Sequence, residues 1–362
     1  MTDREAWFWI NNIEGIGNIK IRQLLEYFGT PMEMYNASEK DFSEIPGVND
    51  VDVARICDLI NKENIHRKYN KFMEKEIKYV FPFEEEYPKR LKELYDKPFI
   101  LYYKGRIPED NIPSVAIIGS RKCTEYGRYV SSEFGRILGG YGVSVISGLA
   151  LGIDSEAHRG CVLAGGRTYA VLAGSAEQCY PQSNYNLYND ILRDGGVISE
   201  FPPGTPTLPG LFPIRNRIVS GLADIVIVVE AGAKSGSLIT VSHALEQNKT
   251  VYAVPGRIGD KFSEGCNRLI GEGAGVITSF DTILEELGIV VSNVKKCEKS
   301  NIGLAREEKM LYSLLLDFVP KSLDTLTELT GMSSRGVLKG LMGLELKGYI
   351  REISQNFYVR IR

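Results

Sequence analysis

One stretch, Val115–Ala157, constrains the fold of this chain more than any other part of it. An apolar run at Val115–Ile118 is too short for a helix and stops at Gly119, which is the pattern of a buried parallel strand. A helical segment at about 125–140, a second strand at Val143–Ile146 and another helix that begins near Asp154 follow. This β-α-β-α order predicts an open parallel sheet, in which ligands bind at the carboxyl ends of the strands.

Strand candidates continue to alternate with helical segments along the chain. They lie at Thr168–Leu172, Val197–Ser199, Asp224–Val229, Thr250–Val254 and Gly275–Thr278. Two earlier candidates, Ile77–Phe81 and Pro98–Tyr103, could extend the same sheet. Alternation on this scale indicates right-handed crossovers and helices on both faces of the sheet. We therefore predict an α/β fold, an extended Rossmann-like and mainly parallel sheet, over residues 66–289.

The turn after the first strand of this sheet is suited to phosphate. Gly119 and Ser120 let a ligand approach the backbone, and the helix that follows presents N–H groups at its N-terminus. Arg121 adds a forked donor. The chain has no G-x-G-x-x-G and no G-x-x-x-x-G-K-[ST] pattern, which disfavours ordinary dinucleotide binding and P-loop hydrolysis.

Further polar segments lie near other strand ends, so one crevice could gather them. The candidate site consists of Gly119, Ser120, Arg121, Ser147, Gly148, Arg215, Asn216, Arg217, Lys234, Ser235, Gly236 and Ser237. Its four cationic side chains would favour a polyanion. Structural alternatives remain open: Ser235 and Ser237 as helix caps, Asp154 as a cap of its own helix, and ion pairs of the two later arginines with Glu200 or Glu230.

Residues 1–65 form a separate helical region in this prediction. Segments 13–29 and 42–60 each combine a glycine-containing turn with an amphipathic helix, and they resemble a pair of helix–hairpin–helix units, as in SAM-like domains. The second hairpin carries Asn49, Asp50 and Asp52 where a phosphate-binding hairpin needs cations. Packing or partner binding is therefore favoured over DNA contact.

The C-terminal region changes character after a polar linker, which we place at 290–305. Residues 306–362 have the order helix, Gly331 turn, second helix and two alternating strands, which is a winged-helix pattern. The second helix, about Ser333–Leu346, carries both basic and acidic side chains. Because reading a DNA groove requires a clear basic face, a protein–protein module is favoured over a DNA reader.

Composition limits the partners and the compartment. With a net charge of −3, binding of nucleic acid requires the cations to gather in one pocket or groove. No apolar run reaches the length of a membrane span, and no signal peptide is visible. The six cysteines include no C-x-x-C pair and only three histidines are present, which disfavours a disulfide framework or a zinc site. We expect scattered reduced thiols and no metal or cofactor.

Five motifs, taken in order, resemble the DprA/Smf family (DNA-processing protein A). They are GSR…YG, SGLALGID, FPIRNRIVSGL, VVEAGAKSGSLIT and AVPG…GCNRLIGEGA, and the dense part of the match covers about 77–288. The resemblance implies a cytoplasmic protein that forms a homodimer and binds single-stranded DNA in its Rossmann domain. It also implies that the protein protects incoming strands and loads the RecA recombinase during natural transformation, without catalytic turnover.

The resemblance also implies roles for individual residues. Arg121 and the arginines of FPIRNR would contact backbone phosphate, and the turns at 147–148 and 235–237 would offer N–H groups to the strand. Leu208–Leu211 lacks the basic residue that some relatives place there. This departure predicts a weaker or differently routed path for the strand.

Two other functions are weighed against strand binding. The LOG-type nucleoside-monophosphate phosphoribohydrolases share this core fold, but EAGAKSGSLIT lacks their PGG and their glutamate. A mononucleotide sensor would keep the pocket, and strand-length dependence separates it from a polymer binder. Aromatic platforms for bases would favour the polymer binder, and the candidates are Tyr126, Tyr180 and Tyr185.

Overall fold

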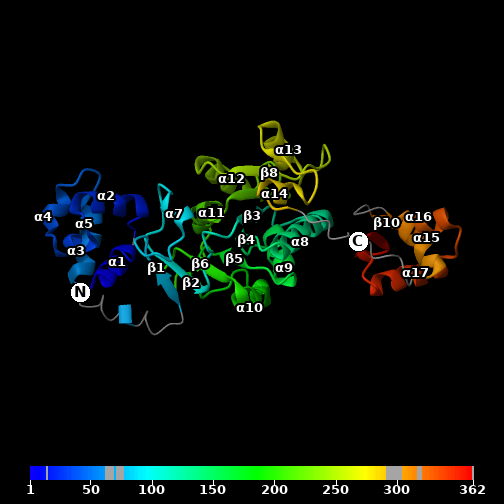
Figure 1. Cartoon of the computed structure of the whole chain (residues 1–362), viewed down its shortest axis with the longest axis horizontal. Helices are drawn as coiled ribbons and strands as arrows, with labels where there is room; N and C mark the ends of the chain where they lie inside the picture. Colours follow the sequence, from blue (N-terminus) through cyan, green and yellow to red (C-terminus); the bar gives the residue numbers. More distant parts are fainter. Residues whose placement is uncertain (14, 62–68, 71–76, 291–303, 316–319, 361–362) are drawn as a thin grey trace. The chain divides into compact units, whose positions relative to one another are not determined.

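The computed structural model describes residues 1–360 except 14, 62–68, 71–76, 291–303 and 316–319 (Figure 1). The chain divides into two compact units, Met1–Ile283 and Leu284–Arg362. We describe each unit by itself. The predicted linker at 290–305 lies almost wholly outside the described residues.

The first unit is built on one nine-stranded sheet with the order β1-β2-β6-β5-β4-β3-β7-β8-β9. The strands are β1 Lys78–Val80, β2 Leu101–Gly105, β3 Ser114–Ile118, β4 Ser144–Ser147, β5 Thr168–Val171, β6 Gly196–Ser199, β7 Ile225–Val228, β8 Thr250–Ala253 and β9 Gly275–Val276. From β6 to β9 all neighbours are parallel, whereas β2 pairs antiparallel with β1 and β6. The predicted extended, mainly parallel sheet is confirmed, and β3 and β7 flank its topological switch point.

Helices cover both faces of this sheet, with α8, α9 and α10 on one side and α11, α12 and α13 on the other (Figure 1). Their bounds are α7 Lys89–Lys92, α8 Glu125–Gly140, α9 Ile153–Leu163, η1 Gln182–Asn184, α10 Tyr185–Asp194, α11 Leu211–Gly221, α12 Ser237–Glu246, α13 Glu264–Gly271 and α14 Thr282–Glu286. Alternate strand residues face opposite layers. Ile118 and Val171 join the cluster that contains α11 and α12, while Ala170 and Leu172 pack with α10.

Helices α8 and α9 pack closely because glycines face each other's backbone. A Cβ atom placed on Gly160 would lie 1.8 Å from the carbonyl oxygen of Ser132. One placed on Gly135 would lie 2.1 Å from the carbonyl oxygen of Ala157. Any larger residue at these positions would push the two helices apart, and with them the loops that they carry at the edge of the sheet.

The N-terminal helices of the first unit share a core with the antiparallel edge of the sheet. They are α1 Asp3–Asn11, α2 Asn18–Phe28, α3 Pro31–Asn36, α4 Glu39–Ser43 and α5 Asp50–Asn61. Turns containing Gly15 and Gly47, both with positive φ, precede α2 and α5, as predicted for two hairpins. Phe81, Phe99 and Tyr102, from β2 and the flanks of β1 and β2, complete the cluster that these helices bury.

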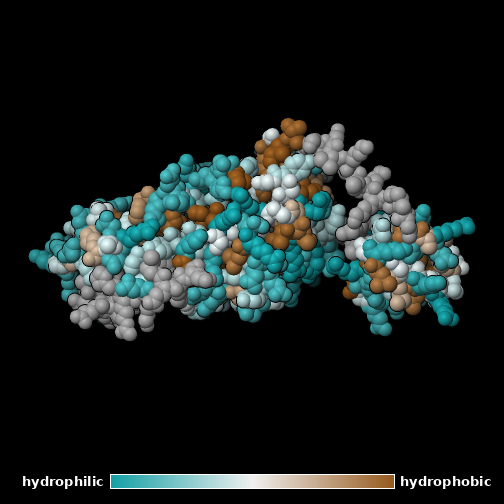
Figure 2. All heavy atoms as spheres, turned by 60° about the horizontal axis from the view of Figure 1, so that its bottom comes forward, coloured by the Kyte–Doolittle hydropathy of each residue, from teal (hydrophilic) through white to brown (hydrophobic). Residues whose placement is uncertain are grey.

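The second unit has the winged-helix arrangement predicted from its sequence. Its elements are α15 Arg306–Leu314, β10 Lys321–Ser322, α16 Leu323–Thr330, α17 Ser334–Leu346, β11 Ile350–Ser354 and β12 Phe357–Arg360. On the face in Figure 2 this unit carries hydrophobic patches among hydrophilic atoms. On α17, Leu338 and Met342 are exposed beside Arg335 and Lys339, so its outer face mixes apolar and basic side chains. Among all the helices described, none is long and apolar enough to cross a membrane.

Candidate functional site

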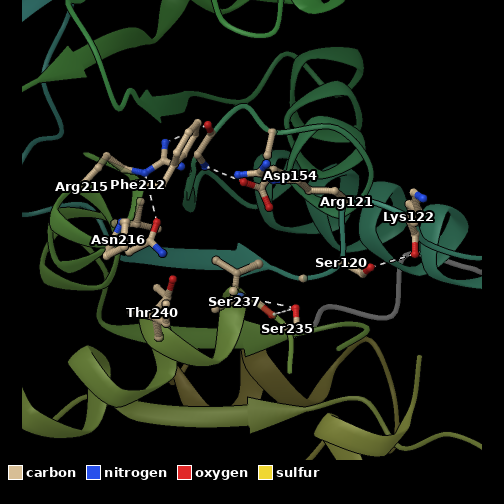
Figure 3. Close-up of a pocket in the computed structure, with 18 of the residues that line it drawn as sticks. Ser120, Arg121, Lys122, Asp154, Phe212, Arg215, Asn216, Ser235, Ser237 and Thr240 are labelled. Atoms are coloured by element: carbon tan, nitrogen blue, oxygen red, sulfur yellow. Dashed lines mark hydrogen bonds between the residues drawn. The ribbon is translucent and has the colours of Figure 1, made fainter. Parts of the chain in front are cut away.

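A pocket of about 590 Å³ opens at the carboxyl ends of the strands around the switch point. Figure 3 shows Ser235 and Ser237 on one side of it and Arg121, Phe212 and Arg215 on the other. Nine of the predicted site residues line the pocket: Gly119, Ser120, Arg121, Gly148, Arg215, Asn216, Ser235, Gly236 and Ser237. The fold therefore brings most of the residues chosen from the sequence to one pocket, at the strand ends where ligands of such sheets bind.

Arg121 is an exposed cation of the pocket, carried by the loop between β3 and α8. Its guanidinium carbon lies 4.7 Å from the centre of the Phe212 ring, within the range of a cation–π contact. Ser120, beside it, donates its hydroxyl hydrogen to the carbonyl oxygen of Lys122 at 2.8 Å and so folds the loop on itself. The guanidinium therefore lies over the Phe212 ring and remains exposed to solvent.

Arg215 has a structural position in the wall, because it is only 4% exposed. Its Nη1 donates to the carbonyl oxygens of Gly148, at 2.9 Å, and Val171. Burial lowers the pKa of Arg215 to about 10, and the nearby carboxylate of Asp154 opposes that shift. The side chain thus joins the loop that follows β4 to the last residue of β5, and it lines the pocket.

The turn at 147–148 does not offer its groups to a ligand as the sequence suggested. The N–H of Gly148 donates to Oδ2 of Asp154 at 3.1 Å, and the hydroxyl of Ser147 donates to the carbonyl oxygen of Ile117 at 2.6 Å. Asp154 is buried, and this burial raises its pKa. It lies inside α9, whose N-cap is Gly152, so it does not cap its own helix but fastens the turn before it.

Arg217 lies outside the residues that line the pocket. It is 4% exposed, its Nε is 2.6 Å from a carboxylate oxygen of Asp96, and its Nη2 donates to Glu200 at 2.7 Å. Asn18, from the start of α2, donates to the same Glu200 carboxylate. The alternative of an ion pair with Glu200 therefore describes this arginine, which joins α11 to the N-terminal helices.

We expect Arg217→Lys to lower stability and not strand affinity. A lysine ammonium cannot replace two guanidinium contacts in different directions, so the free energy of unfolding should fall by about 1–3 kcal/mol. Urea unfolding measures this, with the exposed Arg193→Lys as the matched control, expected within about 0.5 kcal/mol of wild type. Unchanged stability with a tenfold loss of affinity for single-stranded DNA would instead return Arg217 to the binding site.

The N-terminus of α12 forms the opposite side of the pocket. The hydroxyls of Ser235 and Ser237 are 2.8 Å apart, and the N–H of Ser237 donates to Oγ of Ser235 at 3.4 Å, on either side of the N-cap Gly236. Lys234 precedes them on the surface but does not line the pocket. This end of α12 faces the pocket with its positive dipole and small polar side chains, a setting that suits an anion.

Phe212 is not among the site residues predicted from the sequence. It lies within the FPIRNR motif, three positions before Arg215. This spacing could have indicated its role, because residues three apart fall on the same side of a helix. Of the three tyrosines named as platforms, Tyr180 is half-exposed with its ring 5.9 Å from that of Phe212. Tyr185 stacks on Tyr188 instead, 6.3 Å between ring centres, and Tyr126 does not line the pocket.

Comparisons with known proteins give the family and several relatives. Residues 78–288 match the family described as DNA recombination-mediator protein A, and residues 298–355 match the DprA winged helix domain. Protein Smf of Synechocystis is 33% identical over 296 residues, covering 80% of this chain and 74% of that protein. The DNA processing protein DprA of Streptococcus pneumoniae is 42% identical over 202 residues, covering 55% and 71%.

Solved structures agree. The X-ray structure of DprA from Streptococcus pneumoniae superposes with a TM-score of 0.69 at 33% identity, covering 79% of this chain and 98% of that one. A structure of DNA processing protein A from Helicobacter pylori, described by its single-stranded DNA binding mode, has a TM-score of 0.53 at 30% identity, covering 58% and 95%.

Fold and site together define a Rossmann-like protein, with its pocket at the switch point of a mainly parallel sheet. The comparisons specify this class further. The chain belongs to the DNA recombination-mediator protein A family, which is the DprA/Smf family expected from its motifs.

Proposed function

We propose that this protein binds single-stranded DNA in the pocket between β3 and α12. The observation that carries the proposal is the pairing of Arg121 with Phe212, an exposed cation against an aromatic ring. Proteins that hold single strands combine cations for the backbone with rings on which bases stack. The single-stranded DNA binding mode in the description of the Helicobacter pylori relative supports the same function.

The geometry suggests how a strand would lie. Backbone phosphates would meet Arg121 and Lys122 on one side and the start of α12 on the other, while bases would reach Phe212 and Tyr180. Leu208 is exposed on the segment that leads to α11 and adds an apolar side chain there, not a cation. The cations proposed to meet phosphate, Arg121 and Lys122, are gathered at one side of the pocket. Such a local concentration of positive charge is compatible with a net charge of −3 for the chain.

Binding without turnover is part of the proposal. Two carboxylates lie close to the pocket, Asp154 and Glu230. Each accepts hydrogen bonds from backbone N–H groups, of Gly148 and Thr124 respectively, which is a structural use of a carboxylate. Family membership further supports a homodimer that protects incoming strands and loads RecA during natural transformation in the cytoplasm.

Fluorescence anisotropy of a labelled oligo-dT strand, with length and salt varied, tests the function. We expect affinity to rise with strand length and to fall with salt, because phosphate contacts release counterions. Duplex DNA and mononucleotides should compete poorly. No strand binding, with a mononucleotide bound or cleaved in its place, would overturn the proposal and favour a sensor or an enzyme of the phosphoribohydrolase type.

Deleting residues 306–362 tests where the strand binds. Because the pocket lies within the first compact unit, the truncated protein should keep oligo-dT affinity within about threefold of the full chain, less than about 0.7 kcal/mol. The same anisotropy titration measures this, with circular dichroism as the check of folding. Near-total loss of affinity would move the site to the winged-helix unit.

A further inference from the structure

Glu230 touches both ends of the loop that carries Arg121. It follows β7 and is 4% exposed. Its backbone carbonyl oxygen accepts the N–H of Ser120 at 2.7 Å. Its carboxylate accepts the N–H of Thr124 at 2.8 Å and the hydroxyl hydrogen of the same threonine. One residue thus fixes the loop before and after Arg121, and only the second attachment depends on its side chain.

The same carboxylate lies against the first turn of α8. A Cβ atom on Gly127 would be 2.4 Å from Cδ of Glu230, so only glycine permits this approach. Thr124, the N-cap of α8, accepts the Gly127 N–H through its own hydroxyl oxygen at 3.1 Å. The N-terminus of a helix is where an anion is stabilised by the helix dipole. At α8 the protein's own Glu230 takes that position.

We propose that Glu230 is a positioning residue for strand binding: it locks the loop 119–124 against α8 so that Arg121 lies over Phe212. It also occupies the N-terminus of α8, so a phosphate in the pocket would meet the start of α12 and not that of α8. This inference rests on the proposed binding of single-stranded DNA. It concerns how the binding loop is held, which family membership does not specify.

The sign of one substitution separates positioning from simple electrostatics. A carboxylate near a phosphate-binding pocket repels a polyanion, so its neutralisation should strengthen binding if charge alone mattered. If the carboxylate instead holds Arg121 in place, neutralisation frees the loop and weakens binding. Glu230→Gln keeps the size of the side chain and removes the charge, so the two effects predict opposite changes.

The experiment titrates labelled oligo-dT with the full-length protein and its variants. We expect Glu230→Gln to weaken binding about five- to tenfold, an effect typical of removing one well-placed interaction. Glu125→Gln is the matched control, because Glu125 is the next residue after Thr124 and forms a half-exposed ion pair with Arg128 at 3.4 Å. It should leave affinity unchanged within about twofold.

A double-mutant cycle tests whether Glu230 acts through Arg121. In an Arg121→Ala background, Glu230→Gln should change affinity by no more than about twofold, because Lys122 is then the cation that remains on loop 119–124. A purely structural loss elsewhere would still add to the Arg121→Ala effect. Additive losses, or tighter binding by Glu230→Gln alone, would overturn the proposal.

Thr124→Val keeps the test decisive if Glu230→Gln does not fold. This variant leaves the charge of Glu230 in place and removes the hydroxyl that reaches it. It should weaken binding in the same direction, again only when Arg121 is present. Unchanged affinity in this variant would refute the positioning role, whereas failure of the wild-type protein to bind oligo-dT would refute the proposed function itself.

Discussion

Arg121→Glu should weaken binding of single-stranded DNA about 30- to 100-fold at roughly 0.1 M salt. The side chain is exposed in the pocket, and within the described part of the chain no ion pair holds it. Reversal removes a cation from the phosphate backbone and places a carboxylate beside Phe212, where the strand would pass. The slope of log affinity against log salt should also flatten, by about 0.7 for each phosphate that the protein no longer neutralises.

Arg193→Glu provides the control for this charge reversal. Arg193 lies near the end of α10, away from the pocket, and pairs on the surface with Asp190 at 3.0 Å. The two variants carry the same net charge, so a general electrostatic effect would weaken both equally. Circular dichroism confirms folding. Wild-type affinity and salt slope in Arg121→Glu would remove Arg121 from the site.

Gly160→Ala should lower the free energy of unfolding by about 3–4 kcal/mol or prevent folding. The new methyl group would meet a backbone carbonyl of α8 at 1.8 Å, and backbone cannot rotate away as a side chain does. Helices α8 and α9 would have to separate, and this would displace the loops before them that line the pocket. The midpoint of urea unfolding, followed by circular dichroism, measures the loss.

Gly140→Ala is the matched substitution on the partner helix. Gly140 ends α8, and a Cβ atom there would have no atom within 4 Å. Alanine should therefore raise stability by up to about 1 kcal/mol through its helix propensity. A Gly160→Ala variant within about 1 kcal/mol of wild type would show that α8 and α9 can shift apart without cost, contrary to the packing described.

The sheet and the position of its pocket could be predicted from the sequence because both follow from local patterns. Short apolar runs define most of the strands, and the rule that ligands bind at strand ends then places Arg121 and Ser235 together. The choice between alternative partners could not be predicted in this way. Glu200 and Glu230 were both candidates for the later arginines, and the fold pairs Arg217 with Glu200 and with Asp96.

The same limit applies to the N-terminal region. The sequence predicts a helical region over residues 1–65. It does not show that β2 and the residues beside β1 bury their aromatic side chains under those helices. Such a shared core depends on the antiparallel pairing of β1 with β2, a contact between strands and not a property of either segment.

That shared core couples the stability of the N-terminal helices to the stability of the antiparallel edge of the sheet. Opening the N-terminal helices exposes Phe81 and Tyr102, so it also loosens the antiparallel edge, and the two regions should lose protection from hydrogen exchange together. A partner that binds only the helices would therefore stabilise the sheet by mass action. Binding of a partner to the N-terminal helices would thus raise the stability of the sheet through a common unfolding equilibrium, without a conformational change.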